Sequence, residues 1–127
     1  MLWYTFLMKP IIFSSLYLII LLSLSTFIFD PAHLYYELPW LDIPMHILGG
    51  FGVASLACAI LNYKGTKVSY TYVFIAYAVV AVTWEGYEYV HDMIRGRVWN
   101  GWFDTIKDLI DGAIGMSVSY YIQKIKA

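Results

Sequence analysis

Apolar residues gather into long runs along the chain, and short polar segments separate these runs. A helix needs about 20 mostly apolar residues to cross the hydrocarbon layer of a bilayer. Four segments meet this requirement, at residues 11–29, 43–62, 69–90 and 104–123. The pattern therefore predicts an all-α protein, a four-helix transmembrane bundle that forms one integral membrane domain over residues 1–127.

The connections between these runs are of two kinds. Residues 62–67, NYKGTK, are typical of a tight polar turn between helices. Residues 30–41 and 91–103 are longer and rich in tyrosine and tryptophan. Such rings suit the membrane–water interface, because one end of each is apolar and the other polar. We expect them to anchor the bundle in the bilayer.

The composition agrees with a multi-pass protein of the cell membrane, because 61% of the residues are hydrophobic and 13% are charged. A formal net charge of −1 offers no basic surface to nucleic acid, so the lipid bilayer is the expected partner. One cysteine, Cys58, cannot form an internal disulfide, and we interpret it as a packing residue.

The basic residues predict how the bundle is oriented. Those on the side of both termini and of the turn at 62–67 are Lys9, Lys64, Lys67, Lys124 and Lys126. Cytoplasmic segments of membrane proteins carry an excess of Lys and Arg, so we expect both termini in the cytoplasm. Arg95 and Arg97 are the exceptions in the loops. The acidic residues and histidines then lie toward the cell exterior, the periplasm or an equivalent lumen.

Ionisable residues occupy single faces of the predicted helices near that outer side. Asp42 and His46 are four residues apart, which places them about 40° apart around a helix axis. Glu85, Glu88 and Asp92 follow the spacing of three and then four residues that lines one helical face. The ends of the second and third helices can therefore bring these groups together.

The fourth predicted helix has the tightest arrangement. Asp104, Asp108 and Asp111 lie within a sector of about 60°, and Gly115 continues the same stripe. In the second helix, Gly49 continues the stripe of the ionisable residues, and Gly50 and Gly52 lie nearby in the sequence. Small residues let membrane helices approach closely, so we expect these two helices to pack along the faces that carry their charges.

Such a cluster needs positive charge, because a carboxylate in the middle of a membrane helix costs about 2.5–3.5 kcal/mol. Lys107, Arg95 and Arg97 are too few to balance the nearby acids. A divalent metal ion of unknown identity would supply the charge and would also use a histidine nitrogen as a ligand. The predicted metal ligands are Asp42, His46, Glu88, Asp104 and Asp108.

Glu88 and His91 also form a Glu-x-x-His pair, a spacing found in helical bundles that hold two metals. Those sites need the pair on two helices, and this chain has it once. His91 and Asp92 are therefore better interpreted as solvated residues at a helix end.

Two classes of function remain open, so whether the chain is an enzyme is undecided at this point. In the first, a metal activates water or polarises an ester or phosphate oxygen, and Glu85 or Asp111 is the general base. Arg95 and Arg97 would bind the anionic headgroup of a lipid-like substrate. In the second, the cluster handles protons or cations, or binds a partner, without catalysis. A homo-oligomer is compatible with both.

Three segments resemble the YjdF-like family of small bacterial integral membrane proteins and, more loosely, VanZ-like proteins. They are DIPMHILGG from Asp42, WEGYE from Trp84 and DTIKDLIDGAIG from Asp104. The resemblance covers about residues 42–115 and implies one polar site, without implying a reaction. Its members would be Asp42, His46, Glu85, Glu88, Asp104 and Asp108. The chain departs from the pattern by being shorter and by carrying Asp111 in addition.

Overall fold

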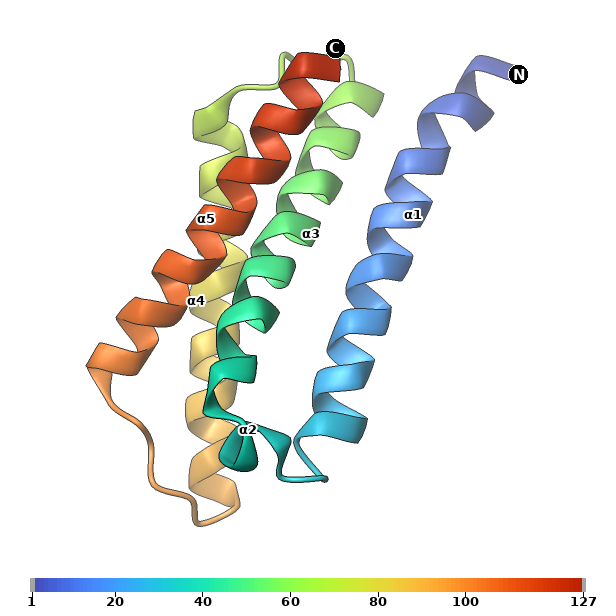
Figure 1. Cartoon of the computed structure of the whole chain (residues 1–127). Helices are drawn as coiled ribbons and strands as arrows, with labels where there is room; N and C mark the ends of the chain where they lie inside the picture. The colour runs from blue at the N-terminus through green and yellow to red at the C-terminus, as the bar shows by residue number, and fades with distance from the viewer. Residues whose placement is uncertain (1, 127) are drawn as a thin grey trace.

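The computed structural model describes the backbone of residues 2–126 and the side chains of residues 6–126. This part of the chain is helical and contains no strand, which confirms the all-helical class (Figure 1). In chain order the elements are α1 (Leu2–Leu24), the π-helical turn η1 (Ser25–Phe29), α2 (Leu34–Glu37), the 3-10 turn η2 (Pro39–Leu41), α3 (Asp42–Tyr63), α4 (Tyr70–Ile94) and α5 (Trp102–Lys126).

Three helix bounds differ from those expected. α1 runs through Pro10, although proline lacks the backbone N–H of a helical hydrogen bond. α4 continues to Ile94 and α5 begins at Trp102, so the connection expected at 91–103 is wrong at both ends. α4 extends beyond residue 90 because neither glycine nor proline stands between Gly86 and Gly96, where the backbone turns left-handed with φ of 66°.

Glycines end both α3 and α4 in the same way. The Thr66 N–H donates to the Leu61 carbonyl across Gly65, and the Arg97 N–H donates to the Asp92 carbonyl across Gly96. These bonds define Schellman motifs, in which glycine takes the left-handed position after the helix. The second motif matters for the site because it turns the chain sharply between Arg95 and Arg97.

The closest helix contact joins α3 and α5. These two helices run in the same direction, because α4 follows α3 in the chain and runs the opposite way before α5 begins (Figure 1). A Cβ on Gly50 would collide with the backbone of Gly112, and a Cβ on Gly115 with that of Ile47. The expected packing of these two helices is therefore present, but Gly49 is the wrong glycine. Nothing lies within 4 Å of the position that a Gly49 Cβ would take.

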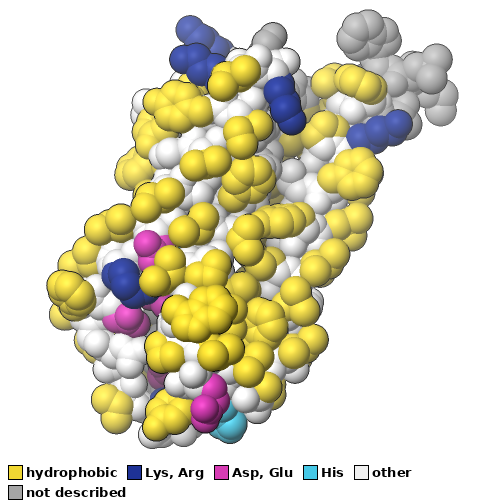
Figure 2. Space-filling view, viewed as in Figure 1, with side chains coloured by type: hydrophobic (Ala, Val, Ile, Leu, Met, Phe, Trp, Pro, Cys, Tyr) yellow, Lys and Arg dark blue, Asp and Glu magenta, His cyan; other side chains and the backbone are white. Residues whose placement is uncertain are grey.

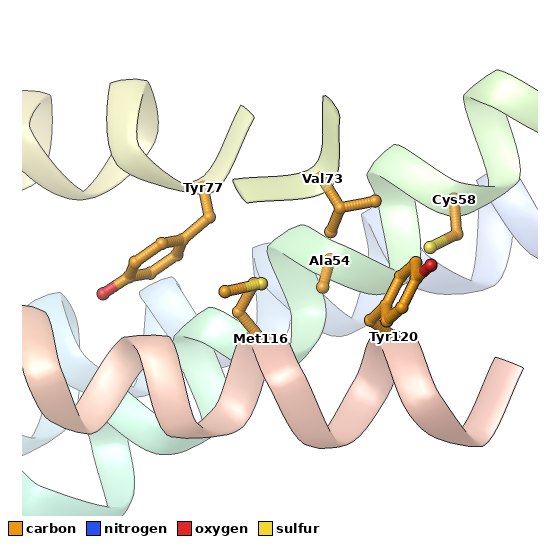
Figure 3. Packing of buried hydrophobic residues seen from close by; sticks show 6 residues of the cluster. All are labelled: Ala54, Cys58, Val73, Tyr77, Met116 and Tyr120. Carbon is orange, nitrogen blue, oxygen red and sulfur yellow. The ribbon is translucent and has the colours of Figure 1, made fainter. Parts of the chain in front are cut away.

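The hydrophobic core lies between α3, α4 and α5 (Figure 3). Its buried members are Ala54, Cys58, Val73, Tyr77, Met116 and Tyr120. Cys58 is thus a packing residue, as expected. α1 stands apart from this core and packs on α3, where the Tyr17 hydroxyl donates to the Leu48 carbonyl at 2.9 Å.

Two helical segments are long and apolar enough to cross a membrane, Phe6–Phe29 and Pro39–Tyr63, with mean hydropathies of 2.3 and 1.7. Hydrophobic side chains cover much of the visible surface (Figure 2). Several Lys or Arg side chains lie at the end that carries both termini, whereas acidic side chains, a histidine and a further basic side chain lie in the opposite half (Figure 2).

We predict that Gly50→Ala and Gly115→Ala destabilise the protein and that Gly49→Ala does not. Overpacking against a facing backbone costs about 1–3 kcal/mol. At an open helical position the same change gains up to about 1 kcal/mol, because alanine has the higher helix propensity. Thermal unfolding of the parent and the three variants in one detergent shows whether each substitution raises or lowers the stability. A Gly50→Ala protein as stable as the parent would contradict the close contact of α3 with α5.

Candidate functional site

The ionisable residues meet where α3 and α5 begin and α4 ends, at the end of the molecule away from both termini (Figure 1). Helix N-termini carry a partial positive charge that stabilises a nearby carboxylate by about 0.3–1 kcal/mol. Asp42 lies in the first turn of α3 and Asp104 in the first turn of α5. Two helix dipoles therefore point their positive ends at the acidic cluster.

One group of four residues from three helices can hold a metal ion. His46 of α3, Glu85 and Glu88 of α4, and Asp108 of α5 each offer one ligand atom, and these atoms lie within 4.8 Å of one another. We call these residues the His46 group. None of the four is exposed, and Asp108 retains only 4% of its accessible surface.

A second possible ligand group consists of Asp42, Asp104 and Asp108, and it meets the same distance criterion. We call it the Asp42 group. Asp108 belongs to both groups, so it links the beginning of α5 to both α3 and α4. The Asp104 carboxylate also accepts a hydrogen bond at 3.2 Å from the side-chain amide of Asn100, a residue of the connection before α5.

His46 joins the two groups directly. Its Nε2 lies 3.2 Å from Asp42 Oδ1 and 3.5 Å from Asp108 Oδ2. Carboxylates at the same ring nitrogen favour a proton on that nitrogen when no metal is bound. Metal binding at this nitrogen would displace the proton, because a ligating histidine must be neutral.

Lys107 places a positive charge inside the Asp42 group. Its Nζ donates to Asp42 Oδ2 at 3.0 Å and to Asp108 Oδ1. Asp111 belongs to neither ligand group; its Oδ2 lies 3.6 Å from Lys107 Nζ and has no hydrogen-bond partner within the described chain. From the sequence, Lys107 was only one of three basic residues near the acids. The structure places its ammonium group in contact with Asp42 and Asp108.

Arg95 and Arg97 bind Asp30 and belong to neither ligand group. Their guanidinium groups donate to the two Asp30 oxygens at 2.8 and 2.6 Å, and Arg97 also lies 3.9 Å from Asp92. Burial alone would raise the pKa of Asp30, but the hydrogen bond from Arg97 and both guanidinium charges hold this pKa below its usual range.

Sequence reasoning missed Asp30. A signal was available, because Asp30 ends the first apolar run on the same side of the predicted bundle as both arginines. His91 was interpreted from the sequence as a solvated residue at a helix end. It is in neither ligand group, and its ring stacks on Tyr87 with centroids 5.5 Å apart.

A polar cavity of about 630 Å³ opens at this end, within the usual size range of ligand pockets. It is lined by acidic residues of both groups, by Lys107 and Arg97, and by aromatic rings that include Tyr35 and Trp84. Asp111 and Arg95 are not among its lining residues. A cation held here would therefore face a space large enough for a small polar group.

The structure thus defines a helical protein with an apolar surface and a cluster of carboxylates and histidine at one end. The chain belongs to the DUF2238 family of predicted membrane proteins, whose family model matches residues 3–125. No match is found among curated proteins or among solved structures. The membrane class is therefore confirmed, while the match does not single out the YjdF-like or VanZ-like families.

We predict that the link from Arg95 and Arg97 to Asp30 stabilises the protein at neutral pH and is lost in acid. Asp30 has a lowered pKa in the folded state, so its contribution is present above the pKa of the unfolded chain, about 4, and disappears as the pH falls through the folded value. The contribution of such a partly exposed pair is about 1 kcal/mol or less.

Melting temperatures of the parent and Asp30→Asn proteins across this pH range measure the effect. Glu37→Gln removes an exposed acid from the same connection and is the control, for which we expect no pH-dependent difference. A constant gap between parent and Asp30→Asn down to the most acidic sample would show that the ion pairs do not cause it.

Proposed function

We propose that all four long helices span the bilayer and that both termini lie in the cytoplasm. α4 and α5 each have 25 residues, long enough at about 1.5 Å per residue to cross the hydrocarbon layer. Exposed side chains on α5 recur every fourth residue at Ile106, Ile110, Ile114 and Val118. Such an apolar stripe suits contact with lipid. Four acidic residues of these helices lie in the two ligand groups instead, namely Glu85, Glu88, Asp104 and Asp108.

This topology predicts that residue 100 faces outward and residue 66 inward. Thr66 and Asn100 are both exposed in connections at opposite ends of α4. In a Cys58→Ala background, we expect a membrane-impermeant maleimide to label Asn100→Cys on intact cells and to label Thr66→Cys only after lysis. The reverse pattern would place the acidic cluster in the cytoplasm, and labelling of both sites on intact cells would contradict the proposed spans.

We propose further that the His46 group binds a divalent metal ion. The observation that carries this proposal is the convergence of four ligand atoms from three helices within 4.8 Å. Three carboxylates and one imidazole leave a surplus of negative charge in a poorly solvated place. Arg95 and Arg97 cannot offset it while they bind Asp30. A ligand set of oxygen and nitrogen favours iron, manganese or zinc over magnesium or calcium.

Lys107 favours the His46 group over the Asp42 group as the metal site. The ammonium group already contacts Asp42 and Asp108, and a metal ion among Asp42, Asp104 and Asp108 would meet it at close range. We therefore infer that Asp42 lies outside the metal sphere, where it pairs with Lys107. Asp104 remains a candidate ligand of lower rank.

The function that this site supports best is metal-assisted chemistry on an anionic, lipid-like substrate at the outward-facing surface of the membrane. The metal would polarise an ester or phosphate oxygen or activate a water molecule. Of the two predicted general bases, only Glu85 lines this cavity, and it would take that role while His46, Glu88 and Asp108 hold the metal. Arg97 lines the polar cavity and would contact the headgroup, whereas Arg95 would act by holding Asp30.

A non-catalytic proton or cation carrier is the second candidate. It is favoured by the chain of close contacts from His46 through Asp42 and Lys107 to Asp111. Alternating access in membrane transporters usually relies on internal repeats, and this chain shows none. Ion flux in proteoliposomes that is lost in the Asp108→Asn variant, without turnover of any lipid, would favour this candidate over the enzyme.

We predict that the purified protein holds about one divalent ion per chain and that Asp108→Asn removes it, because Asp108 is a ligand in both groups. Asp111→Asn is the matched control on the same helix and should retain the ion. Asp104→Asn should also retain it if the His46 group is the site. Elemental analysis measures the metal, and a chelator should lower the melting temperature only of the metal-loaded proteins.

A parent protein that stays metal-free after incubation with iron, manganese or zinc would refute the metal centre. Equal metal content in the Asp108→Asn and parent proteins would place the ion elsewhere. Loss in Asp104→Asn together with retention in Glu88→Gln would move the site to the Asp42 group.

A further inference from the structure

We propose that the site takes a lipid with a phosphate-type headgroup and that one hydrocarbon chain of this lipid lies in an apolar groove between α1 and α4. This inference rests on the metal centre proposed above, which would bind the anionic headgroup. It adds where the chain of the substrate lies and how the substrate enters.

A second cavity, of about 520 Å³, provides the groove. Its walls are mainly apolar, with Leu18 and Leu22 on α1, Val53 on α3, and Val80 and Ala81 on α4. It shares lining residues with the polar cavity, among them Tyr35, Trp84, Glu85, Glu88 and Asp108. The two cavities thus adjoin along these side chains, so a ligand that reached both would lie with one end among charged groups and the other among apolar ones.

The polarity of the two cavities follows the direction of the membrane normal. The polar cavity reaches Asp30 and Asn100 in the connections, and the apolar cavity reaches Val53 and Tyr77 within the helices. From Asp42 to Val53 the helix rises about 16 Å, which is half of a hydrocarbon layer of about 30 Å. A lipid of the outer leaflet has the same arrangement, with its headgroup outward and its chain pointing to the midplane.

The side of the groove between α1 and α4 offers a way in. Within residues 2–126, α1 packs on α3 and makes no extensive contact with α4. A lipid chain is as apolar as the groove walls, so leaving the bilayer for the groove changes its free energy little. The headgroup then supplies the affinity, while the groove lets it reach the metal without drawing the chain into polar surroundings.

Gly49 makes the groove testable. It lines the apolar cavity on α3, and a Cβ built there meets nothing within 4 Å. Gly49→Leu should therefore fill the groove without displacing α3. Gly86→Leu is a matched control, because Gly86 also lies inside a helix with open space at its Cβ position, yet lines neither cavity.

The experiment uses the full chain in phosphatidylcholine nanodiscs with palmitoyl lysophosphatidate that carries a photoreactive diazirine in its chain. We expect cross-links at groove residues of α1 and α4 such as Leu22 and Val80. Gly49→Leu should lower their yield by about tenfold, the change that a loss of about 1.4 kcal/mol produces. Gly86→Leu should leave the yield unchanged. Elemental analysis of each sample reports the metal centre separately.

Cross-links spread over all lipid-facing surfaces, or a yield that Gly49→Leu does not lower although its metal is retained, would overturn the groove. The same holds if inorganic phosphate displaces the cross-links and Gly49→Leu has no effect, since the headgroup alone would then be recognised. Cross-links between two copies of the chain at the groove would identify a second protein molecule as its occupant. Metal-free protein that cross-links in the groove with undiminished yield would overturn the attachment of the headgroup to the metal.

Discussion

The close approach of α3 and α5 is the constraint on which the site depends. His46 lies beside Asp108, and four residues further along both helices Gly50 faces Gly112. The backbones touch at this second level because neither residue has a side chain. One helical turn away, an imidazole nitrogen of α3 and a carboxylate oxygen of α5 lie 3.5 Å apart. A larger residue in the glycine pair would therefore move the ligands as well as weaken the bundle.

Charge balance explains why the basic residues are divided as they are. Arg95 and Arg97 sit on both sides of the turn at Gly96 and close on Asp30, which ties the connection after α4 to the end of the first helical segment. Lys107 alone enters the cluster, and it contacts Asp42 and Asp108. Glu85 and Glu88 on α4 are left without a basic partner in the described chain. This unequal division is the physical basis for placing the metal at the His46 group.

Much of this arrangement could be predicted from the sequence, because helical periodicity fixes which residues share a face. The spacing of Asp42 and His46, and of Asp104 and Asp108, was enough to bring these residues to one place. Periodicity does not fix how far each helix is rotated about its own axis relative to the neighbouring helix. For that reason Gly49 was expected at the contact that Gly50 makes, and Asp111 was grouped with acids that it does not join. Long-range pairs such as Asp30 with Arg97 need the tertiary path of the chain.

The misplaced glycine also bears on function. Because Gly50 takes the helix contact, Gly49 lines the apolar cavity beside α1, which adjoins the acidic cavity. A site meant only for small ions needs water access and ligands, and apolar walls that reach toward the midplane add nothing to ion binding. A site for an amphiphile needs both surfaces in the order observed here. The arrangement of the two adjoining cavities therefore favours the proposed lipid chemistry over ion passage, because the proposed metal centre would lie where a headgroup would.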